Sequence, residues 1–130
     1  MMSTQTVTVT TPETILEAIL DAFNRHDLDA IIAFFAEDAT LETPRGSEPW
    51  GTRYEGKAAV REGLAARFSG IPDVHYGEGR HFVCGERAVS EWLLTGTTTT
   101  SQRIAVRGCD LWEFRDGLVV RKDSYWKIVE

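Results

Sequence analysis

The C-terminal half of the chain is built from long runs of strand-forming residues, and this pattern constrains the fold more than any other feature. Four such runs follow one another, each bounded by turn signals, at residues 74–84, 87–97, 103–114 and 118–129. The last two are joined by Arg115-Asp116-Gly117, and an Asp-Gly pair is a strong hairpin signal. We therefore expect a meander of long antiparallel strands.

Three helices are expected before this meander. Thr11-Pro12-Glu13 starts the first with a capping hydroxyl, a proline at the first helical position and an acid in the first turn. Asp27 can cap a short second helix, and residues 56–68 form the third. A strand at 39–43, ended by a proline, and a turn-rich loop at 45–53 lie between them. This order predicts an α+β fold in which the helices cover one side of a curved antiparallel sheet.

Length and composition bound the organisation of the chain and its partners. The 130 residues suit one domain, which we place at residues 11–130 after a flexible lead-in at 1–10. With 14 Lys and Arg against 20 Asp and Glu, the formal net charge of −6 argues against nucleic acid or an anionic membrane as a partner. Two cysteines are too few for a disulfide framework and no secretion signal is visible, so we expect a cytoplasmic protein.

Several stretches that together span nearly the whole chain carry a family resemblance. They are Ala22–Asp29, Phe35–Pro44, Gly46–Pro49, Gly108–Gly117 and Ser124–Trp126. These stretches resemble the nuclear transport factor 2-like superfamily, and within it the ketosteroid isomerase-related and polyketide-cyclase-like branches. The resemblance implies a cone-shaped fold with the three helices on the concave side of the sheet, and a homodimer. It implies no single activity, since this fold hosts isomerases, hydrolases, cyclases, dehydratases and modules without chemistry.

The catalytic groups of ketosteroid isomerase are only partly present. By the resemblance, Thr43 stands where that family has its proton-shuttling aspartate, and Ile19 stands where it has an oxyanion-hole tyrosine. The second acid of that oxyanion hole corresponds to Asp110 and is retained. Steroid isomerisation by that mechanism is therefore not expected. Polyketide cyclases use an acid on the equivalent late strand as general base, and Asp110 fits that role.

Asp110 is the first predicted catalytic residue. Aspartate is disfavoured inside strands and costly to bury without partners, so its place between Cys109 and Leu111 indicates a function. The implied fold points its side chain into the cone, where an apolar setting would poise the carboxyl group for proton transfer. The alternative is a structural acid that pairs with an arginine or caps backbone amides.

Glu91 is the second predicted catalytic residue, because it interrupts the apolar run 88–94. Period-two alternation puts either Glu91 with its alternate neighbours or Ser90, Trp92 and Leu94 on the inner face, and both alternatives remain open. Two carboxyl groups at one site would have different pKa values, so that one could act as the acid and the other as the base.

A set of mostly aromatic side chains is predicted to line the cavity and bind the ligand. Alternation puts Trp112 on the face of Asp110, and a lysine near that carboxylate would hold it ionised as a base. The predicted set is Ile19, Phe23, Trp50, Tyr54, Trp112, Lys122, Ser124 and Trp126. The alternatives are plain core packing for the tryptophans of the strands, a solvated edge for Lys122, and an interface role for Trp50 and Tyr54.

Residues and resemblance together predict a small-molecule enzyme. We expect a cofactor-independent isomerase, cyclase or dehydratase that transfers a proton on a small apolar, oxygenated ligand. A metal site is not expected, because His75 and His81 lack a third ligand at firm spacing. The alternative is a non-catalytic module that binds a hydrophobic ligand or serves as an accessory domain.

Overall fold

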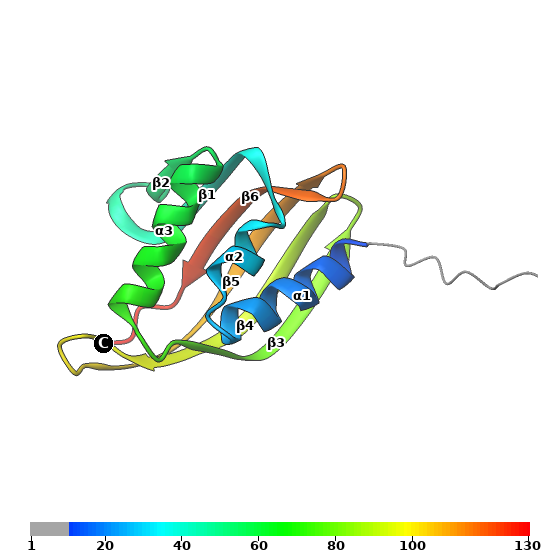
Figure 1. Ribbon diagram of the computed structural model, residues 1–130. Helices are drawn as coiled ribbons and strands as arrows, with labels where there is room; N and C mark the ends of the chain where they lie inside the picture. The colour runs from blue at the N-terminus through cyan, green and yellow to red at the C-terminus, as the bar shows by residue number, and fades with distance from the viewer. Residues whose placement is uncertain (1–10) are drawn as a thin grey trace, which may run out of the picture.

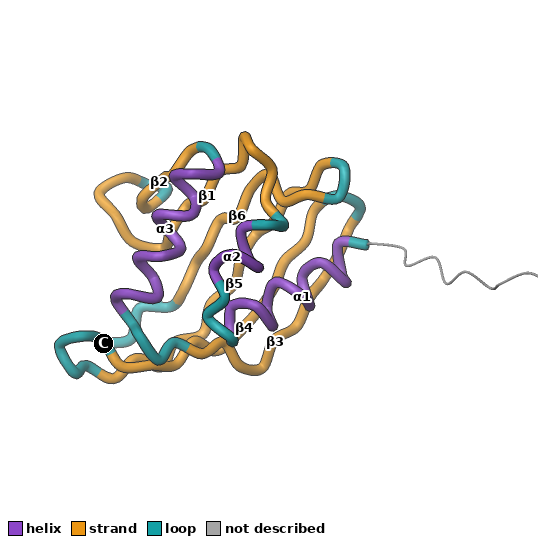
Figure 2. Tube along the Cα trace, in the orientation of Figure 1, coloured by secondary structure: helices purple, strands orange, loops and turns teal. Residues whose placement is uncertain are grey.

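Three helices lie on one face of a six-stranded curved sheet in a computed structural model that describes residues 11–130 (Figure 1; Figure 2). The lead-in expected at residues 1–10 lies outside the described part. The elements, in chain order, are α1 (Pro12–Asn24), α2 (Leu28–Ile32), β1 (Phe35–Glu48), β2 (Gly51–Glu55), α3 (Lys57–Gly70), β3 (His75–Cys84), β4 (Arg87–Thr97), β5 (Arg103–Arg115) and β6 (Leu118–Trp126). None of these helices is long and apolar enough to cross a membrane.

The sheet has the strand order β2-β1-β6-β5-β4-β3 and does not close. The α+β prediction is confirmed, and the antiparallel meander runs from β3 to β6 as expected. The sheet as a whole is mixed, because β1 pairs with β6 in parallel, with Leu41 opposite Lys122. The expectation of a wholly antiparallel sheet misses this pair, since strand patterns report local conformation and not the direction of a partner about 80 residues away.

The first strand is longer than predicted, and the loop expected at 45–53 contains most of a hairpin. β1 runs past Pro44, and β2 folds back on it with Thr43 opposite Thr52. The register of the pairing shifts between Thr43 and Glu48, so Pro44 lies in an irregular segment. Its nitrogen carries no hydrogen, and here the strand pairing requires no hydrogen bond from it. A proline therefore marks a bulge here and does not end the strand.

The core lies between α1, α2, α3 and the inner face of the sheet. The helix α1 begins as predicted, with the Thr11 hydroxyl accepting from the Thr14 backbone N–H. Its apolar stripe faces the sheet, where alternate residues of β4 and β5 are buried. The buried residues of these three elements are Ile15, Leu16, Ile19, Ala22 and Phe23 of α1, Ala88, Ser90, Trp92, Leu94 and Gly96 of β4, and Asp110, Trp112 and Phe114 of β5.

Two polar side chains join the end of α1 to the start of β3. The Asn24 amide donates to the backbone carbonyl of Tyr76 at 3.0 Å and accepts from its N–H at 2.9 Å. The His26 ring bonds to the Val74 carbonyl oxygen at 2.6 Å and packs against the Phe68 ring. These contacts set the position of Tyr76 relative to α1, and they hold a helix C-terminus that has no basic residue in its last turn.

Replacing Asn24 by alanine should remove both bonds to Tyr76 and leave its backbone groups unpaired. We expect the free energy of unfolding to fall by about 1–3 kcal/mol, measured by urea denaturation. Asp21→Ala is the matched control on the same helix, because Asp21 is exposed and pairs only with exposed Arg25. Equal losses in the two variants would contradict this role of Asn24.

Candidate functional site

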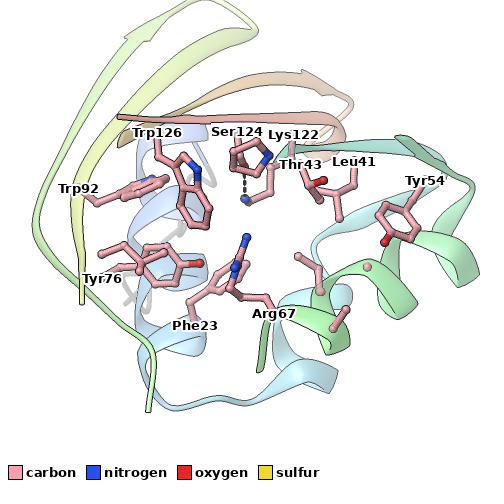
Figure 3. A pocket seen from close by; sticks show the side chains of 15 residues that line it. Phe23, Leu41, Thr43, Tyr54, Arg67, Tyr76, Trp92, Lys122, Ser124 and Trp126 are labelled. Atoms are coloured by element: carbon pink, nitrogen blue, oxygen red, sulfur yellow. Dashed lines mark hydrogen bonds between the residues drawn. The ribbon is translucent and has the colours of Figure 1, made fainter. Parts of the chain in front are cut away.

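A cavity of about 170 Å³ lies over the middle of the sheet, between α1 on one side and α3 on the other. Five aromatic side chains line it, and its polar side chains include the hydroxyls of Thr43, Tyr54, Tyr76 and Ser124 and the cations Arg67 and Lys122 (Figure 3). The lining side chains are Phe23 from α1, Leu64 and Arg67 from α3, Leu41 and Thr43 from β1, Tyr54 from β2, Tyr76 from β3, Trp92 and Leu94 from β4, and Lys122, Ser124 and Trp126 from β6, together with Pro44, Gly63 and Ala66.

A buried polar cluster forms the sheet side of this cavity. The Asp110 carboxylate accepts from Lys122 Nζ at 3.0 Å and from Ser124 Oγ at 2.5 Å through Oδ1, and from Trp92 Nε1 at 2.8 Å through Oδ2. Lys122 also donates to Ser124 Oγ at 2.8 Å, as the dashed line in Figure 3 shows. The carboxylate thus has three donors, of which Lys122 is also its counterion, so the alternative in which a lysine lies beside Asp110 is the one found.

The register of the meander builds this cluster. Asp110 lies opposite Ser124 on β6 and opposite Ser90 on β4, and alternation turns all three side chains to the helix-covered face. Asp110 and Lys122 keep only 4% and 6% of their surface exposed. Charges buried this deeply require partners, and within residues 11–130 no buried polar side-chain atom lacks one.

Asp110 itself does not line the 170 Å³ cavity. It borders a second space of about 20 Å³ under α1, which is room for about one water molecule. Ile19 and Trp112 border the same space, and Trp112 Nε1 donates to Ser90 Oγ at 2.9 Å. The carboxylate therefore reaches the larger cavity through Lys122 and Ser124.

His81 was not predicted as a site residue, but it borders both this small space and a groove beside Glu13 and Glu17 of α1. Its Nδ1 lies 2.7 Å from Ser90 Oγ. Burial lowers the pKa of His81, against the opposing effect of Glu17 and Glu13, so the neutral imidazole is favoured. Among residues 11–130, no group of three or more His, Cys, Asp or Glu side chains could hold a metal ion.

Tyr76 and Arg67 are two further polar residues of the cavity that were not predicted from the sequence. Burial raises the pKa of Tyr76, partly offset by the charge of Arg67, so its hydroxyl stays protonated. The Arg67 guanidinium lies 4.7 Å from the centre of the Trp126 ring. A signal for Arg67 existed, since it follows buried Leu64 by three positions and so shares its helix face.

Most of the predicted ligand-binding residues are brought together, and one is not. Phe23, Tyr54, Lys122, Ser124 and Trp126 line the larger cavity, while Ile19 and Trp112 line the smaller space. Trp50 borders neither space: its side chain is exposed, with the Arg53 guanidinium 4.3 Å from its ring centre. It lies at the turn of the hairpin between β1 and β2, which carries it away from the cavity.

Glu91 does not line the 170 Å³ cavity, although it is among the residues that border the 20 Å³ space beside Asp110. Ser90 and Trp92 are buried on the inner face, so Glu91 lies on the opposite, outer face, opposite Cys109 of β5. It makes no hydrogen bond to the Asp110 cluster within the described chain. The second alternative for this strand, with Ser90, Trp92 and Leu94 inward, is the one found.

The chain is similar in sequence and fold to proteins of one superfamily. A profile of the SnoaL-like domain matches residues 16–122. A candidate polyketide cyclase from Xanthomonas campestris pv. campestris is 25% identical with a TM-score of 0.79, covering 88% of this chain and 89% of that one. An NTF2-like protein of unknown function from Burkholderia pseudomallei also has a TM-score of 0.79, at 20% identity and with coverage of 88% and 89%. A protein of ketosteroid isomerase-like fold from Catenulispora acidiphila, in complex with trimethylamine, has a TM-score of 0.77, 22% identity and coverage of 92% and 88%.

Removing either member of the Asp110–Lys122 pair should destabilise the protein strongly. Asp110→Ala or Lys122→Met leaves one buried charge without its counterion, and we expect each to lower the free energy of unfolding by about 3–5 kcal/mol in urea denaturation. The exposed pair Arg115–Asp38 is the matched control, and Asp38→Ala should cost about 1 kcal/mol or less. A loss for Lys122→Met as small as that of the control would contradict the buried pair.

Proposed function

The chain belongs to the SnoaL-like domain family, and we propose that it is a small-molecule enzyme that transfers a proton on an apolar, oxygenated compound. The reaction is of the isomerase, cyclase or dehydratase type and uses no cofactor. The observation that carries this proposal is the buried Asp110–Lys122–Ser124 cluster, which meets an aromatic-lined cavity through the side chains of Lys122 and Ser124. The similarity to a candidate polyketide cyclase supports it.

Ser124 is the member of the cluster placed to exchange a proton with the ligand. Its hydroxyl borders the cavity and donates to Asp110 Oδ1 at 2.5 Å. In the proposed step, Ser124 Oγ takes a proton from a carbon next to a carbonyl group while its own proton passes to Asp110. The reverse transfer returns a proton to a different atom of the compound, so atoms and charges balance without an oxidant or a co-reactant.

Lys122 stabilises the negative charge that develops on the compound when the proton leaves. Its ammonium group borders the cavity, and its two hydrogen bonds to Asp110 and Ser124 leave one of its three donors for the ligand. A donor that is already fixed in place stabilises such an oxyanion more than a donor in bulk solvent, which must first reorient. Ser124 and Lys122 are thus the groups in contact with the ligand, and Asp110 is the base behind them.

A non-catalytic ligand-binding module is the second candidate function. One observation favours it: both carboxylate oxygens of Asp110 already accept hydrogen bonds, as a purely structural ion pair would require. The trimethylamine complex of the Catenulispora acidiphila protein shows a protein of similar fold holding a small molecule. The two functions differ in whether a bound compound exchanges protons.

Ser124→Ala and Asp110→Asn test the proton transfer. Wild-type protein should catalyse deuterium incorporation next to the carbonyl group of a β,γ-unsaturated single-ring ketone in D₂O, followed by NMR. Both variants should lower the rate at least about 10²-fold, because each breaks the relay. Ser124→Ala should leave ketone affinity nearly unchanged, since Ser124 makes no hydrogen bond to an aromatic wall, and circular dichroism should show that both variants are folded. Glu91→Gln, on the outer face, is the control and should exchange at the wild-type rate. Ketone binding without exchange in the wild type would favour the binding module.

We also propose that the outer face of the sheet pairs two copies of the chain as a homodimer. This face carries half-buried apolar residues such as Leu93, and Tyr125 is 53% exposed on it. Glu91, Arg107 and Lys127 line the same outer groove, so the face holds both signs of charge and can complement itself. The cavity lies on the other side of the sheet, so dimer formation leaves it accessible.

Sedimentation velocity tests this pairing. The wild type should sediment as a dimer at micromolar concentrations, and Tyr125→Glu should shift it to a monomer, because the variant places an unpaired charge in the interface. Asp38→Ala, an exposed change on β1, serves as the control and should remain dimeric. A wild-type monomer would refute the proposal.

A further inference from the structure

Arg67 is a cation inside the cavity, and it forms no ion pair within the described part of the chain. No carboxylate of residues 11–130 lies within 4.0 Å of its guanidinium, although acids outnumber bases in the chain, 20 to 14. The other cation of the cavity, Lys122, is neutralised by Asp110 at 3.0 Å. Arg67 enters from α3, and its half-buried side chain extends toward the middle of the cavity (Figure 3).

Among residues 11–130, no acidic residue lines the cavity, so this charge is uncompensated on its walls. The guanidinium is held near the Trp126 ring, 4.7 Å from its centre, which restricts its orientation. A guanidinium held in place presents paired N–H donors that match the two oxygens of a carboxylate. The protonated hydroxyl of Tyr76 borders the same space and can donate a further hydrogen bond.

The size of the cavity limits the ligand to about one ring. Its volume of about 170 Å³ compares with about 150 Å³ for an apolar protein cavity that binds benzene. Pockets for drug-sized ligands span about 300–1,000 Å³, so a ligand of several fused rings would extend out of this one. The rings of Phe23, Tyr76 and Trp92 provide walls against which a planar ligand can pack.

From these observations we infer that the ligand is a carboxylate bearing a single ring or an unsaturated chain of similar size, with Arg67 binding its charge. The inference rests on the proposed function only in taking this cavity as the ligand site. Aromatic walls also suit ammonium ions, but Arg67 would repel them and no acidic wall would attract them. Arg67 is thus the residue that selects anions, and the Lys122–Ser124 side of the cavity faces the rest of the molecule.

Equilibrium binding of benzoate, benzamide and tetramethylammonium, measured by calorimetry, tests this inference. Benzamide has the ring and shape of benzoate without its charge. The wild type should bind benzoate at least about tenfold more tightly than benzamide, and Arg67→Gln should abolish that preference, since a charge-assisted bidentate contact is lost. Arg61→Gln is the matched control, because Arg61 lies on the same helix but pairs with exposed Asp29 at the surface. Circular dichroism should show both variants folded.

Four results would overturn the inference: equal binding of benzoate and benzamide, unchanged benzoate affinity in Arg67→Gln, tighter binding of tetramethylammonium than of benzoate, or no benzoate binding at millimolar concentrations. The binding measurement requires no proton transfer. If benzoate binds as expected and no ketone exchanges deuterium, only the enzyme proposal fails. If ketone exchange depends on Ser124 and benzoate does not bind, only the inference about the anion fails.

Discussion

The ion pair between Asp110 and Lys122 is the interaction on which the rest of the site depends. Two charges with almost no solvent exposure can exist in an apolar layer only if they face each other and their remaining hydrogen bonds are satisfied. That requirement ties β5 to β6 in one register and recruits Ser124 and Trp92 as further donors. A one-residue slip of β6 against β5 would turn Lys122 to the opposite face of the sheet and leave Asp110 without its counterion.

The helices convert this face of the sheet into a cavity by covering it unevenly. α1 packs over the side of β3 and closes the space around Ile19 and Trp112, whereas α3 packs over β1 and β2. The gap between them stays open above Lys122 and Ser124. The site therefore combines Lys122, a paired cation on the sheet, with Arg67, a cation on the opposite helix that has no ion-pair partner among residues 11–130.

Local patterns predicted the elements well and the partners of the elements poorly. The limits of β4 follow from its composition, and the cap at Thr11 follows from local chemistry, so both were predicted to within a residue. The parallel pairing of β1 with β6 and the hairpin at β2 depend on contacts between segments far apart in the chain. The face occupied by Glu91 was undecided for the same reason: alternation relates neighbours within a strand but does not say which set meets the helices.

The amino-acid sequence alone determined the α+β class, the antiparallel meander and the unusual position of Asp110, because secondary structure and the scarcity of acids in strand interiors are local properties. Only the tertiary structure decided that Asp110 pairs with Lys122 behind the cavity wall, that Glu91 and Trp50 do not line the 170 Å³ cavity, and that Arg67 enters it. Those outcomes depend on which faces meet when three helices pack on a twisted sheet, and that is a property of the whole fold.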